Sequence, residues 1–340
     1  MYDVRIYDYC IFGKGKINMN KIVSIITPTF NNHDTINETI ESVLSQDVSS
    51  WELIIVDDGS NDDTLQLIKK YCINDPRIKL FKRKSDPKGG STCRNIGILN
   101  ASGEFVLFLD SDDLLEPFCI RQRLKVMDEY PDLEMGIFLM KRFYKKKGDS
   151  DEIVNILDSS DPLLNYLKGR FPWTITSPIW RRSLLIELKG FNEEYKRLQD
   201  PELHTRALFH TGNYKLFYDY PADCFYRIIP SRYQSNDIIK EMINGYTKFY
   251  DDNFKVITRN GNESQIKALK RSLRNLLFEI ARMCNDREML KMTLQFPIKI
   301  KMISGNTANY LLLKYTVYQK IIYFIKKIRN ILRIYLNKFD

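Results

Sequence analysis

The stretch Glu104-Phe-Val-Leu-Phe-Leu-Asp-Ser-Asp-Asp113 decides the fold of this chain. Five consecutive apolar residues follow Glu104, and three carboxylates occupy the next four positions. An apolar run of this length, bounded by Gly103, is typical of a strand buried on both faces of a parallel sheet. Asp110, Asp112 and Asp113 then follow the carboxyl end of that strand, where open α/β sheets bind their ligands.

The three carboxylates have two possible interpretations, a cation-binding site or a solvent-exposed turn. Neighbouring carboxylates repel one another, so a partly buried cluster needs a cation or several hydrogen-bond donors. Oxygen ligands of this kind suit Mg²⁺ or Mn²⁺, with phosphate oxygens of a substrate completing the coordination shell. The alternative is a solvated turn or an acidic helix cap, because Leu114-Leu-Glu-Pro117 follows and can start a helix.

Two strands expected earlier in the chain also end in polar residues. The first is Ile22–Thr27, closed by Pro28, and the second is Trp51–Val56, followed by Asp57-Asp58-Gly59-Ser60. Helices are expected after each strand and again from Lys88, with a short strand at 78–81. This alternation of strands and helices predicts βαβ units, a mostly parallel sheet and the α/β class.

The order of elements changes after Asp113. We expect a helix at 120–130, a strand at 135–140, and a helix entered through Pro178-Ile-Trp-Arg-Arg182. The Lys- and Arg-rich run 141–147 is the expected tip of a strand pair, with a phosphate-contacting loop as the alternative. A further helix is expected from Leu198 to about residue 210.

Composition narrows the class of partner. The 340 residues carry 52 Lys and Arg against 43 Asp and Glu, a net charge of +9, which fits phosphate-bearing ligands or an anionic membrane surface and does not by itself separate them. We expect no nucleic-acid partner. Six cysteines without a CxxC pair indicate reduced thiols and a cytoplasmic protein. We also expect no secretory segment and no span long enough to cross a bilayer.

The polar strand ends are expected to converge on one crevice, because the carboxyl ends of parallel strands lie side by side. A carboxylate there can accept the N3–H of uracil or bind ribose hydroxyls, and an arginine on the following helix can reach a base or a phosphate. The candidate residues for nucleotide binding are Thr27, Pro28, Thr29, Asp57, Asp58, Arg94, Asp110, Ser111 and Asp112.

Six motifs in this order resemble family 2 glycosyltransferases over roughly residues 21–230. They are Thr-Pro-Thr-Phe-Asn at 27–31, Val-Asp-Asp-Gly-Ser-Asn-Asp-Asp-Thr at 56–64, Arg-Asn-Ile-Gly at 94–97, Asp-Ser-Asp-Asp at 110–113, Gly-Phe-Asn-Glu at 190–193 and Gln-Asp-Pro-Glu-Leu at 199–203. The resemblance implies the GT-A fold and inverting transfer of a sugar from a nucleotide-diphospho-sugar, expected to be a UDP-sugar, to an acceptor hydroxyl. It also implies a Mn²⁺ or Mg²⁺ cofactor and a role in bacterial surface polysaccharide or glycolipid assembly.

The resemblance also implies a role for individual residues. Thr27, Pro28 and Asp57 match the nucleobase-binding edge, Asp110 matches the ribose-binding position, Asp112 the metal ligand of the DXD motif, and Asp200 the general base. Gln199 stands where the family usually has Glu, which removes a charge beside the expected base. Trp173, Thr174 and Gln199 are candidates for the acceptor side, with core packing as the alternative for Trp173 and Thr174.

These expectations divide the chain into regions. Residues 1–20 are expected to be a poorly structured extension, 21–115 the nucleotide-sugar half of the GT-A domain and 116–230 its acceptor half. A helical region at 231–308 precedes a basic amphipathic helix at 309–340. Such a helix fits an anionic bilayer surface and a lipid-linked saccharide acceptor, or else packs on the protein itself.

Other functions stay open on the sequence alone. A nucleotidyltransferase that activates a sugar phosphate would carry a Gly-rich, basic loop after the first strand, and a methyltransferase would carry a Gly-rich first turn. This chain has Thr-Pro-Thr-Phe-Asn there instead. A non-catalytic protein that binds a nucleotide-sugar is the remaining alternative.

Overall fold

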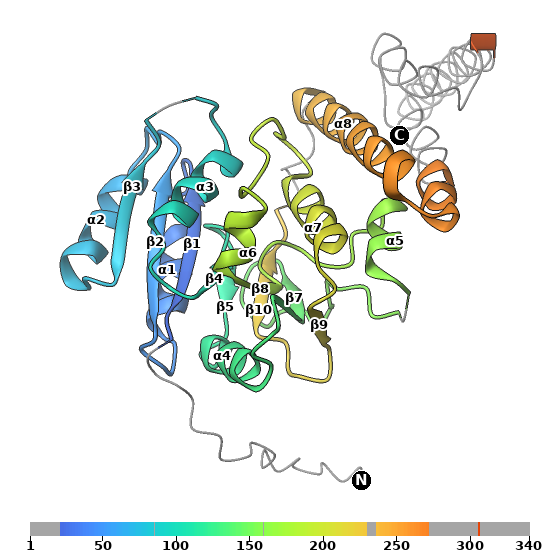
Figure 1. Cartoon of the computed structure of the whole chain (residues 1–340). Coiled ribbons are helices and arrows are strands. Elements are labelled where there is room, and N and C mark those ends of the chain that lie inside the picture. Colours follow the sequence, from blue (N-terminus) through green and yellow to red (C-terminus); the bar gives the residue numbers. More distant parts are fainter. Residues whose placement is uncertain (1–20, 85, 159, 230–235, 272–304, 307–340) are drawn as a thin grey trace, which may run out of the picture. The chain divides into compact units, whose positions relative to one another are not determined.

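The computed structural model describes residues 21–84, 86–158, 160–229, 236–271 and 305–306 (Figure 1). These residues form two compact units. Unit 1 contains the described residues up to Leu157, together with Trp173–Glu193 and Arg206–Ile228. Unit 2 contains Asp158–Pro172, Glu194–Thr205 and the described residues from Ile229 onward. The expected extension at 1–20 and the expected helix at 309–340 lie outside the described residues.

Unit 1 is built on a seven-stranded sheet in the order β3-β2-β1-β4-β8-β6-β9. Four neighbouring strands, β3 to β4 in this order, run parallel, and only β8 runs antiparallel to its two partners. The predicted α/β class with a mostly parallel sheet is therefore confirmed. The strands are β1 Val23–Thr29, β2 Trp51–Asp57, β3 Ile78–Lys82, β4 Phe105–Phe108, β6 Met135–Phe138, β8 Pro178–Arg181 and β9 Tyr214–Phe217.

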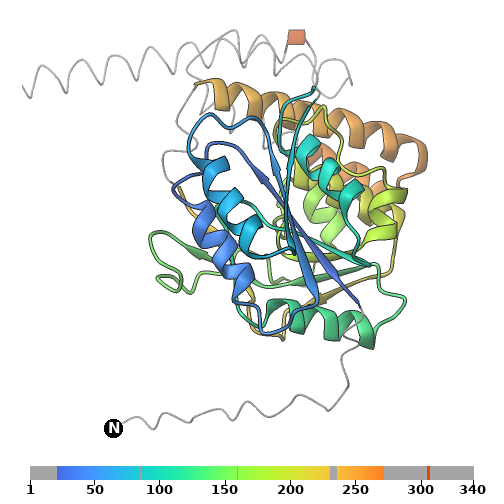
Figure 2. The same cartoon turned by 90° about the vertical axis from the view of Figure 1, so that its left-hand side faces the viewer.

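Helices cover both faces of the parallel half of this sheet. On one face, α1 (Ile36–Leu44) and α2 (Thr64–Asn74) pack with Ile25 in the main core and lie side by side in Figure 2. On the other face, α3 (Gly90–Asn100) packs against β1 so closely that a Cβ at Gly97 would lie 2.3 Å from a side-chain carbon of Ile26. Burial on both faces explains why these strands are continuous apolar runs.

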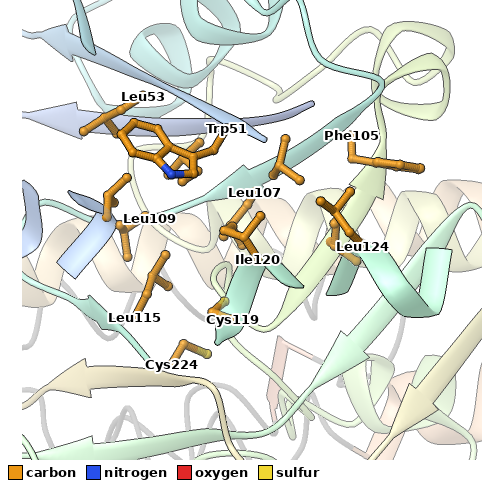
Figure 3. Close-up of a cluster of buried hydrophobic side chains, with 14 of the residues drawn as sticks. Trp51, Leu53, Phe105, Leu107, Leu109, Leu115, Cys119, Ile120, Leu124 and Cys224 are labelled. Carbon is orange, nitrogen blue, oxygen red and sulfur yellow. The ribbon is translucent and has the colours of Figure 1, made fainter. Parts of the chain in front are cut away.

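The main core continues from the parallel strands to a smaller sheet. Figure 3 shows Leu107 and Leu109 near Ile120 and Leu124 of α4 (Cys119–Glu129), with Cys224 beyond them. The smaller sheet has the order β5-β10-β7, from Leu114–Leu115, Cys224–Arg227 and Met140–Phe143. Strand β10 runs antiparallel to β5 and parallel to β7. The acidic loop 110–113 thus connects the two sheets.

The prediction of one strand at 135–140 is wrong. The run forms β6 in the large sheet and β7 in the small one, with Leu139 between them. The side-chain amide of Asn155 bridges the break: it accepts from the Met140 amide at 2.8 Å and donates to the Phe138 carbonyl at 3.1 Å. A side chain distant in sequence therefore satisfies the backbone groups where the ladder stops.

Two other boundaries differ from expectation. Strand β1 does not close at Pro28 but continues to Thr29, because β4 pairs with β1 only as far as Ile26 and the missing N–H of Pro28 therefore breaks no bond on that side. The segment from Pro178 does not lead directly into a helix. It forms β8, paired on both sides, before the short helix α6 (Arg182–Glu187).

The basic run 141–147 continues β7 into a tight turn, as expected for the tip of a strand pair. The Asp149 carboxylate accepts the amides of Tyr144, Lys145 and Lys146 at 2.8–3.0 Å, which closes the turn. The Lys141–Ile153 bridge then returns the chain antiparallel to β7.

Unit 2 is helical in its described part. It contains α5 (Pro162–Leu167), the first residues of α7 (Gln199–His210) and α8 (Asn236–Asn260). Aromatic rings form its interior, with Phe171 stacked on Tyr246 at 6.1 Å. Helical backbone also covers 263–271, so helices occupy most of the described part of the expected helical region at 231–308. Across the described residues, no helix combines the length and apolarity that crossing a membrane requires.

Candidate active site

The carboxyl ends of three neighbouring strands meet at one edge of the sheet. Thr29 of β1 lies opposite Asp57 of β2, and the Leu109 amide, just after β4, donates to the Ile26 carbonyl at 3.0 Å. The expected convergence of the β1 end, Asp57-Asp58 and the acidic loop 110–113 on this edge is therefore present in the structure.

Hydroxyl and amide side chains of the loop after β1 hold the acidic loop. Asn32 Nδ2 donates to Ser111 Oγ at 2.8 Å, and Thr35 Oγ1 donates to the Ser111 carbonyl at 3.0 Å. One turn later, Thr39 Oγ1 donates to the Asp113 carbonyl at 3.0 Å. The backbone between Ser111 and Asp113 is thereby tied to α1 at both ends.

Arg94 and Asp110 form an ion pair at this edge. Arg94 is 6% exposed, and its Nη2 lies 2.6 Å from Asp110 Oδ1. The guanidinium also lies 5.3 Å from the ring centre of Phe191. Arg94 was predicted to reach a base or a phosphate; in the structure it forms an ion pair with a carboxylate whose side chain is 31% exposed.

The next residue joins two of the motifs. Asn95 Nδ2 donates to the Phe191 carbonyl at 3.0 Å and to Glu193 Oε1 at 2.8 Å, while Asn95 Oδ1 accepts the Phe191 amide at 2.7 Å. The Arg-Asn motif at 94–95 and the Gly-Phe-Asn-Glu motif at 190–193 are therefore adjacent in space.

Asp57 and Asp58 are both buried and have different partners. Asp57 accepts the backbone amides of Gly59 and Ser60 at 3.0–3.2 Å, which closes the turn after β2. Asp58 Oδ1 accepts from Arg83 Nε at 2.5 Å and from the Gly89 amide at 3.2 Å. Asp58 therefore ties the loop after β3 to the start of α3.

The thiol of Cys93 lies close to this group. Burial raises the pKa of Cys93 to about 12, and the Asp58 carboxylate contributes to the rise. Cys93 is thus a neutral thiol at physiological pH and not a nucleophile.

Two hydroxyls at the end of β1 are buried without a hydrogen-bond partner among the described residues. These are Thr27 Oγ1 and Thr29 Oγ1, on residues that are 1% and 2% exposed. Buried polar atoms are nearly always satisfied in folded proteins, and the exceptions need an explanation. A polar ligand at this edge provides one for both hydroxyls.

The carboxylates of this edge fit a divalent cation shared with a substrate. No group of three or more His, Cys, Asp or Glu side chains arranged to hold a metal occurs in the part of the chain that the structure describes. Mg²⁺ and Mn²⁺ bound with a nucleotide need only one or two protein carboxylates, because phosphate oxygens and waters complete the shell. Asp112, on the acidic loop and 4% exposed, is the carboxylate predicted for this role.

Asp200 and Gln199 lie in unit 2, in the first turn of α7. Gln199 Nε2 donates to the Lys196 carbonyl at 3.3 Å. Both residues stand at a helix amino terminus, where an acidic residue also serves as a favourable helix-end charge. The catalytic assignment of Asp200 stays a prediction.

His204 and the acceptor-side candidates Trp173 and Thr174 pack against or contact other residues of the protein. His204 Nδ1 lies 2.8 Å from the Tyr166 hydroxyl in the interior of unit 2. Trp173 is 2% exposed, and Thr174 Oγ1 lies 2.9 Å from Met140 Sδ. The burial of Trp173 favours the core-packing alternative over stacking on an acceptor sugar.

The sequence patterns did not indicate a role for Arg83 or Arg227 at this edge of the sheet. Arg227 is the last residue of β10, and its Nε donates to the Asp112 carbonyl at 2.8 Å. Its sequence neighbours are typical of any buried strand end, and the contact spans 115 positions. Arg83 follows β3, and its acidic neighbour in sequence, Asp86, gives no indication of the contact with Asp58.

This mostly parallel sheet flanked by helices has the GT-A glycosyltransferase fold, which solved structures of glycosyltransferases share. The chain belongs to glycosyl transferase family 2, whose family profile matches residues 24–207.

Three relatives show how far the sequence similarity extends. A GalNAc(5)-diNAcBac-PP-undecaprenol beta-1,3-glucosyltransferase of Campylobacter jejuni is 33% identical over 174 residues, 51% of this chain and 55% of that protein. The poly(ribitol-phosphate) beta-N-acetylglucosaminyltransferase TarS of Staphylococcus aureus is 31% identical over 196 residues, 56% of this chain and 33% of TarS. An uncharacterized glycosyltransferase of Rickettsia felis is 44% identical over 107 residues, 32% of this chain and 17% of that protein. The matches thus span little more than half of these relatives at most.

Solved structures share the fold at low identity. S. aureus TarS 1-349 in complex with UDP-GlcNAc has a TM-score of 0.55 at 18% identity, covering 88% of this chain and 92% of that one. The mannosyltransferase PcManGT from Pyrobaculum calidifontis, in complex with GDP-Man and Mn²⁺, has a TM-score of 0.52 at 16% identity, covering 88% and 84%.

Proposed function

We propose that this protein transfers a sugar from a UDP-sugar to an acceptor hydroxyl with inversion of the anomeric centre. The observation that carries the proposal is the meeting of three strand ends, which brings the β1 end, Asp57 and the acidic loop 110–113 to one edge of the sheet. Membership of family 2 and the UDP-GlcNAc bound in the TarS structure support a nucleotide-sugar donor.

The donor's nucleoside is assigned to the β1 and β2 ends. The hydroxyls of Thr27 and Thr29 are buried without a hydrogen-bond partner among the described residues, which supports a polar ligand at this edge. Pro28, which lies between them in the sequence, is assigned to the same nucleobase-binding edge. Asp57 borders the base. Asp110, oriented by Arg94, accepts ribose hydroxyls through its exposed side.

Asp112 would hold Mn²⁺ or Mg²⁺ at the diphosphate. When bound, the ion neutralises the charge that develops on the leaving diphosphate. The mannosyltransferase structure with GDP-Man and Mn²⁺ supports this cofactor for the fold.

Asp200 is assigned the role of general base. An acceptor hydroxyl must lose its proton as it attacks, which requires a carboxylate within hydrogen-bond reach. Attack from the face opposite the diphosphate inverts the anomeric centre. Gln199 leaves Asp200 without the neighbouring carboxylate that the family usually has.

The acceptor is proposed to be a lipid-linked saccharide, in the assembly of a bacterial surface polysaccharide or glycolipid. The name of the Campylobacter relative includes an undecaprenol diphosphate-linked saccharide. The sequence 309–340, outside the described residues, has the basic amphipathic pattern of a segment that binds an anionic membrane surface. A cytoplasmic enzyme held at the inner face of the membrane is consistent with both the lipid-linked acceptor and the basic amphipathic segment.

A donor panel tests the proposal. The full-length protein is incubated with UDP-, GDP- and dTDP-sugars and Mn²⁺, and release of the nucleoside diphosphate is measured. We expect release from a UDP-sugar, its loss on addition of EDTA, and its loss in Asp112→Asn but not in the exposed control Asp151→Asn.

Two results would contradict the proposal. Release from none of the donors, with or without a saccharide acceptor, would remove the transferase assignment. Release of pyrophosphate from a nucleoside triphosphate and a sugar phosphate would instead favour a nucleotidyltransferase.

A further inference from the structure

Arg227 makes four contacts around the acidic loop. Its Nε donates to the Asp112 carbonyl at 2.8 Å, and its backbone amide donates to Asp113 Oδ1 at 3.0 Å. Its Nη2 lies 3.0 Å from Glu38 Oε2, and its guanidinium lies 4.5 Å from the ring centre of Phe143. One residue thus connects the acidic loop to α1, β7 and β10.

These contacts determine how the Asp112 carboxylate is presented. The Asp112 carbonyl belongs to the planar peptide that joins Asp112 to Asp113, so a bond to this oxygen restricts ψ of Asp112 and φ of Asp113. The bond from the Arg227 amide to Asp113 Oδ1 also ties the next residue of the loop to β10. Together the two bonds hold the chain on the carboxyl side of Asp112 and so restrict the direction of its Cα–Cβ bond.

The burial of Arg227 makes its contacts rigid and strengthens the electrostatic effect of its charge on the acidic loop. Arg227 is 8% exposed, so its hydrogen bonds compete little with water. Its positive charge lies beside a loop that carries three carboxylates, and it reduces the repulsion that would otherwise push them apart. The planar guanidinium donates along fixed directions, which an ammonium group does not do.

We propose that Arg227 is a positioning residue that orients Asp112 toward a divalent cation shared with the donor diphosphate. This inference rests on the proposed function, because it takes Asp112 as the metal ligand. Groups that orient metal ligands without touching the metal typically change metal affinity by roughly 10–100-fold when they are removed.

Arg181 provides a matched control. Like Arg227, it contacts a carboxylate, a carbonyl and a phenylalanine ring: Nη1 lies 2.6 Å from Glu104, Nε 3.1 Å from the Leu133 carbonyl, and the guanidinium 5.2 Å from the Phe105 ring centre. Arg181 differs from Arg227 in its location. It contacts Phe105 at the beginning of β4, whereas the acidic loop follows the end of β4. Replacing Arg181 therefore shows how UDP binding changes when an arginine with similar contacts is lost away from the acidic loop.

The experiment measures UDP binding by calorimetry at a series of Mn²⁺ concentrations, and again in EDTA. The variants are Arg227→Lys, Arg227→Gln and the control Arg181→Lys, each in the full chain. We expect both Arg227 variants to need at least ~10-fold more Mn²⁺ for half-maximal UDP affinity. Their metal-free UDP affinity and the Mn²⁺ requirement of Arg181→Lys should stay within about twofold of wild type.

The outcomes separate this inference from the proposed function. Wild-type protein that binds UDP no better with Mn²⁺ than with EDTA would overturn both. Wild-type protein with a clear Mn²⁺ requirement, and Arg227 variants with the same requirement, would overturn the positioning role alone. An equal loss of UDP affinity with and without Mn²⁺ would also overturn it, since that pattern indicates general damage to the site. If Arg227→Gln fails to fold, Arg227→Lys retains the charge and gives the same test.

Discussion

Arg94 Nη2 lies 2.6 Å from Asp110 Oδ1, and the two residues come from α3 and from the loop after β4. The arginine is almost fully buried, whereas the aspartate is 31% exposed on its side chain. The carboxylate therefore neutralises a buried cation and still presents an accessible oxygen to a ligand.

Asp110→Asn is expected to weaken both the fold and UDP binding. The amide leaves the Arg94 charge without its anionic partner, and a hydrogen bond between charged groups is worth about 1.5–3 kcal/mol. Because Asp110 is partly exposed, we expect a loss of about 1–2 kcal/mol in the free energy of unfolding, measured in urea. Asp86→Asn is the control, since Asp86 is 94% exposed and lies 3.6 Å from Arg83. Equal stability of the two variants would show that the Arg94–Asp110 pair contributes nothing.

Asp200→Asn should separate binding from chemistry. Without a base, turnover with a true acceptor is expected to fall by roughly 10²–10⁴-fold, while the dissociation constant for UDP stays within about twofold. Glu202→Gln, in the same first turn of α7, is the control. Wild-type turnover in Asp200→Asn would leave Asp200 as a helix-end charge without a catalytic role.

Glu52 lies at the end of the sheet opposite the acidic loop, and it should make the free energy of unfolding depend on pH. Burial by itself raises the pKa of Glu52, but hydrogen bonds from Lys79, Ser24 and Ser102 outweigh it and lower the pKa to about 2. The contacts are Lys79 Nζ at 2.7 Å, Ser24 Oγ at 2.6 Å and the Ser102 amide at 2.7 Å. Because the folded-state pKa lies below the ordinary glutamate value of 4.5, the stabilisation is present above pH 4.5 and is lost as pH falls toward 2.

Glu52→Gln tests this pH dependence. The shift corresponds to at most about 3 kcal/mol, and we expect about 2 kcal/mol because the partly exposed Lys79 is screened by solvent. Urea unfolding at pH 7 should show that loss, and the variant's stability should change less than that of wild type between pH 4.5 and 3. UDP affinity should be unchanged, since Glu52 is at the amino end of β2. Parallel pH curves for the two proteins would contradict the assignment.

The sequence 309–340 predicts binding to anionic vesicles. Each Lys or Arg near such a surface contributes about 1 kcal/mol, and salt screens this attraction. Deletion of 309–340 should release the protein from anionic vesicles at low salt without changing its affinity for UDP. Co-sedimentation at two salt concentrations measures this, and neutral vesicles serve as the control. Equal pelleting of the full chain and the deletion variant would exclude membrane binding through this segment.

The parallel half of the fold could be predicted because its signals are local. Apolar runs such as Trp51–Val56 are buried on both faces, and the polar residues that end them mark one edge of the sheet. Strand β8 could not be found in this way. Its apolar residues Ile179 and Trp180 fit a helix start equally well, and only pairing with β4 and β6 decides in favour of a strand.

The acidic loop could be predicted as a site but its supports could not. Asp110 and Asp112 stand out by their charge beside an apolar run. The anchors Arg83 and Arg227 depend on tertiary contacts, and charged residues at strand ends are common on any protein surface. The break at Leu139 likewise depends on Asn155, a residue on a later segment that bridges the ends of β6 and β7.

The contact between Arg227 and Asp112 also bears on the order of events during synthesis. Strands β1 to β4 emerge from the ribosome first, whereas β10, which pairs with β5 and carries Arg227, follows the acidic loop by 115 residues. At a translation rate of about 5–20 residues per second, the nascent loop waits roughly 6–23 s for its anchor. A nascent chain can therefore assemble the parallel strands well before it acquires a properly held Asp112, and a truncation that ends ahead of β10 would leave that residue without its support.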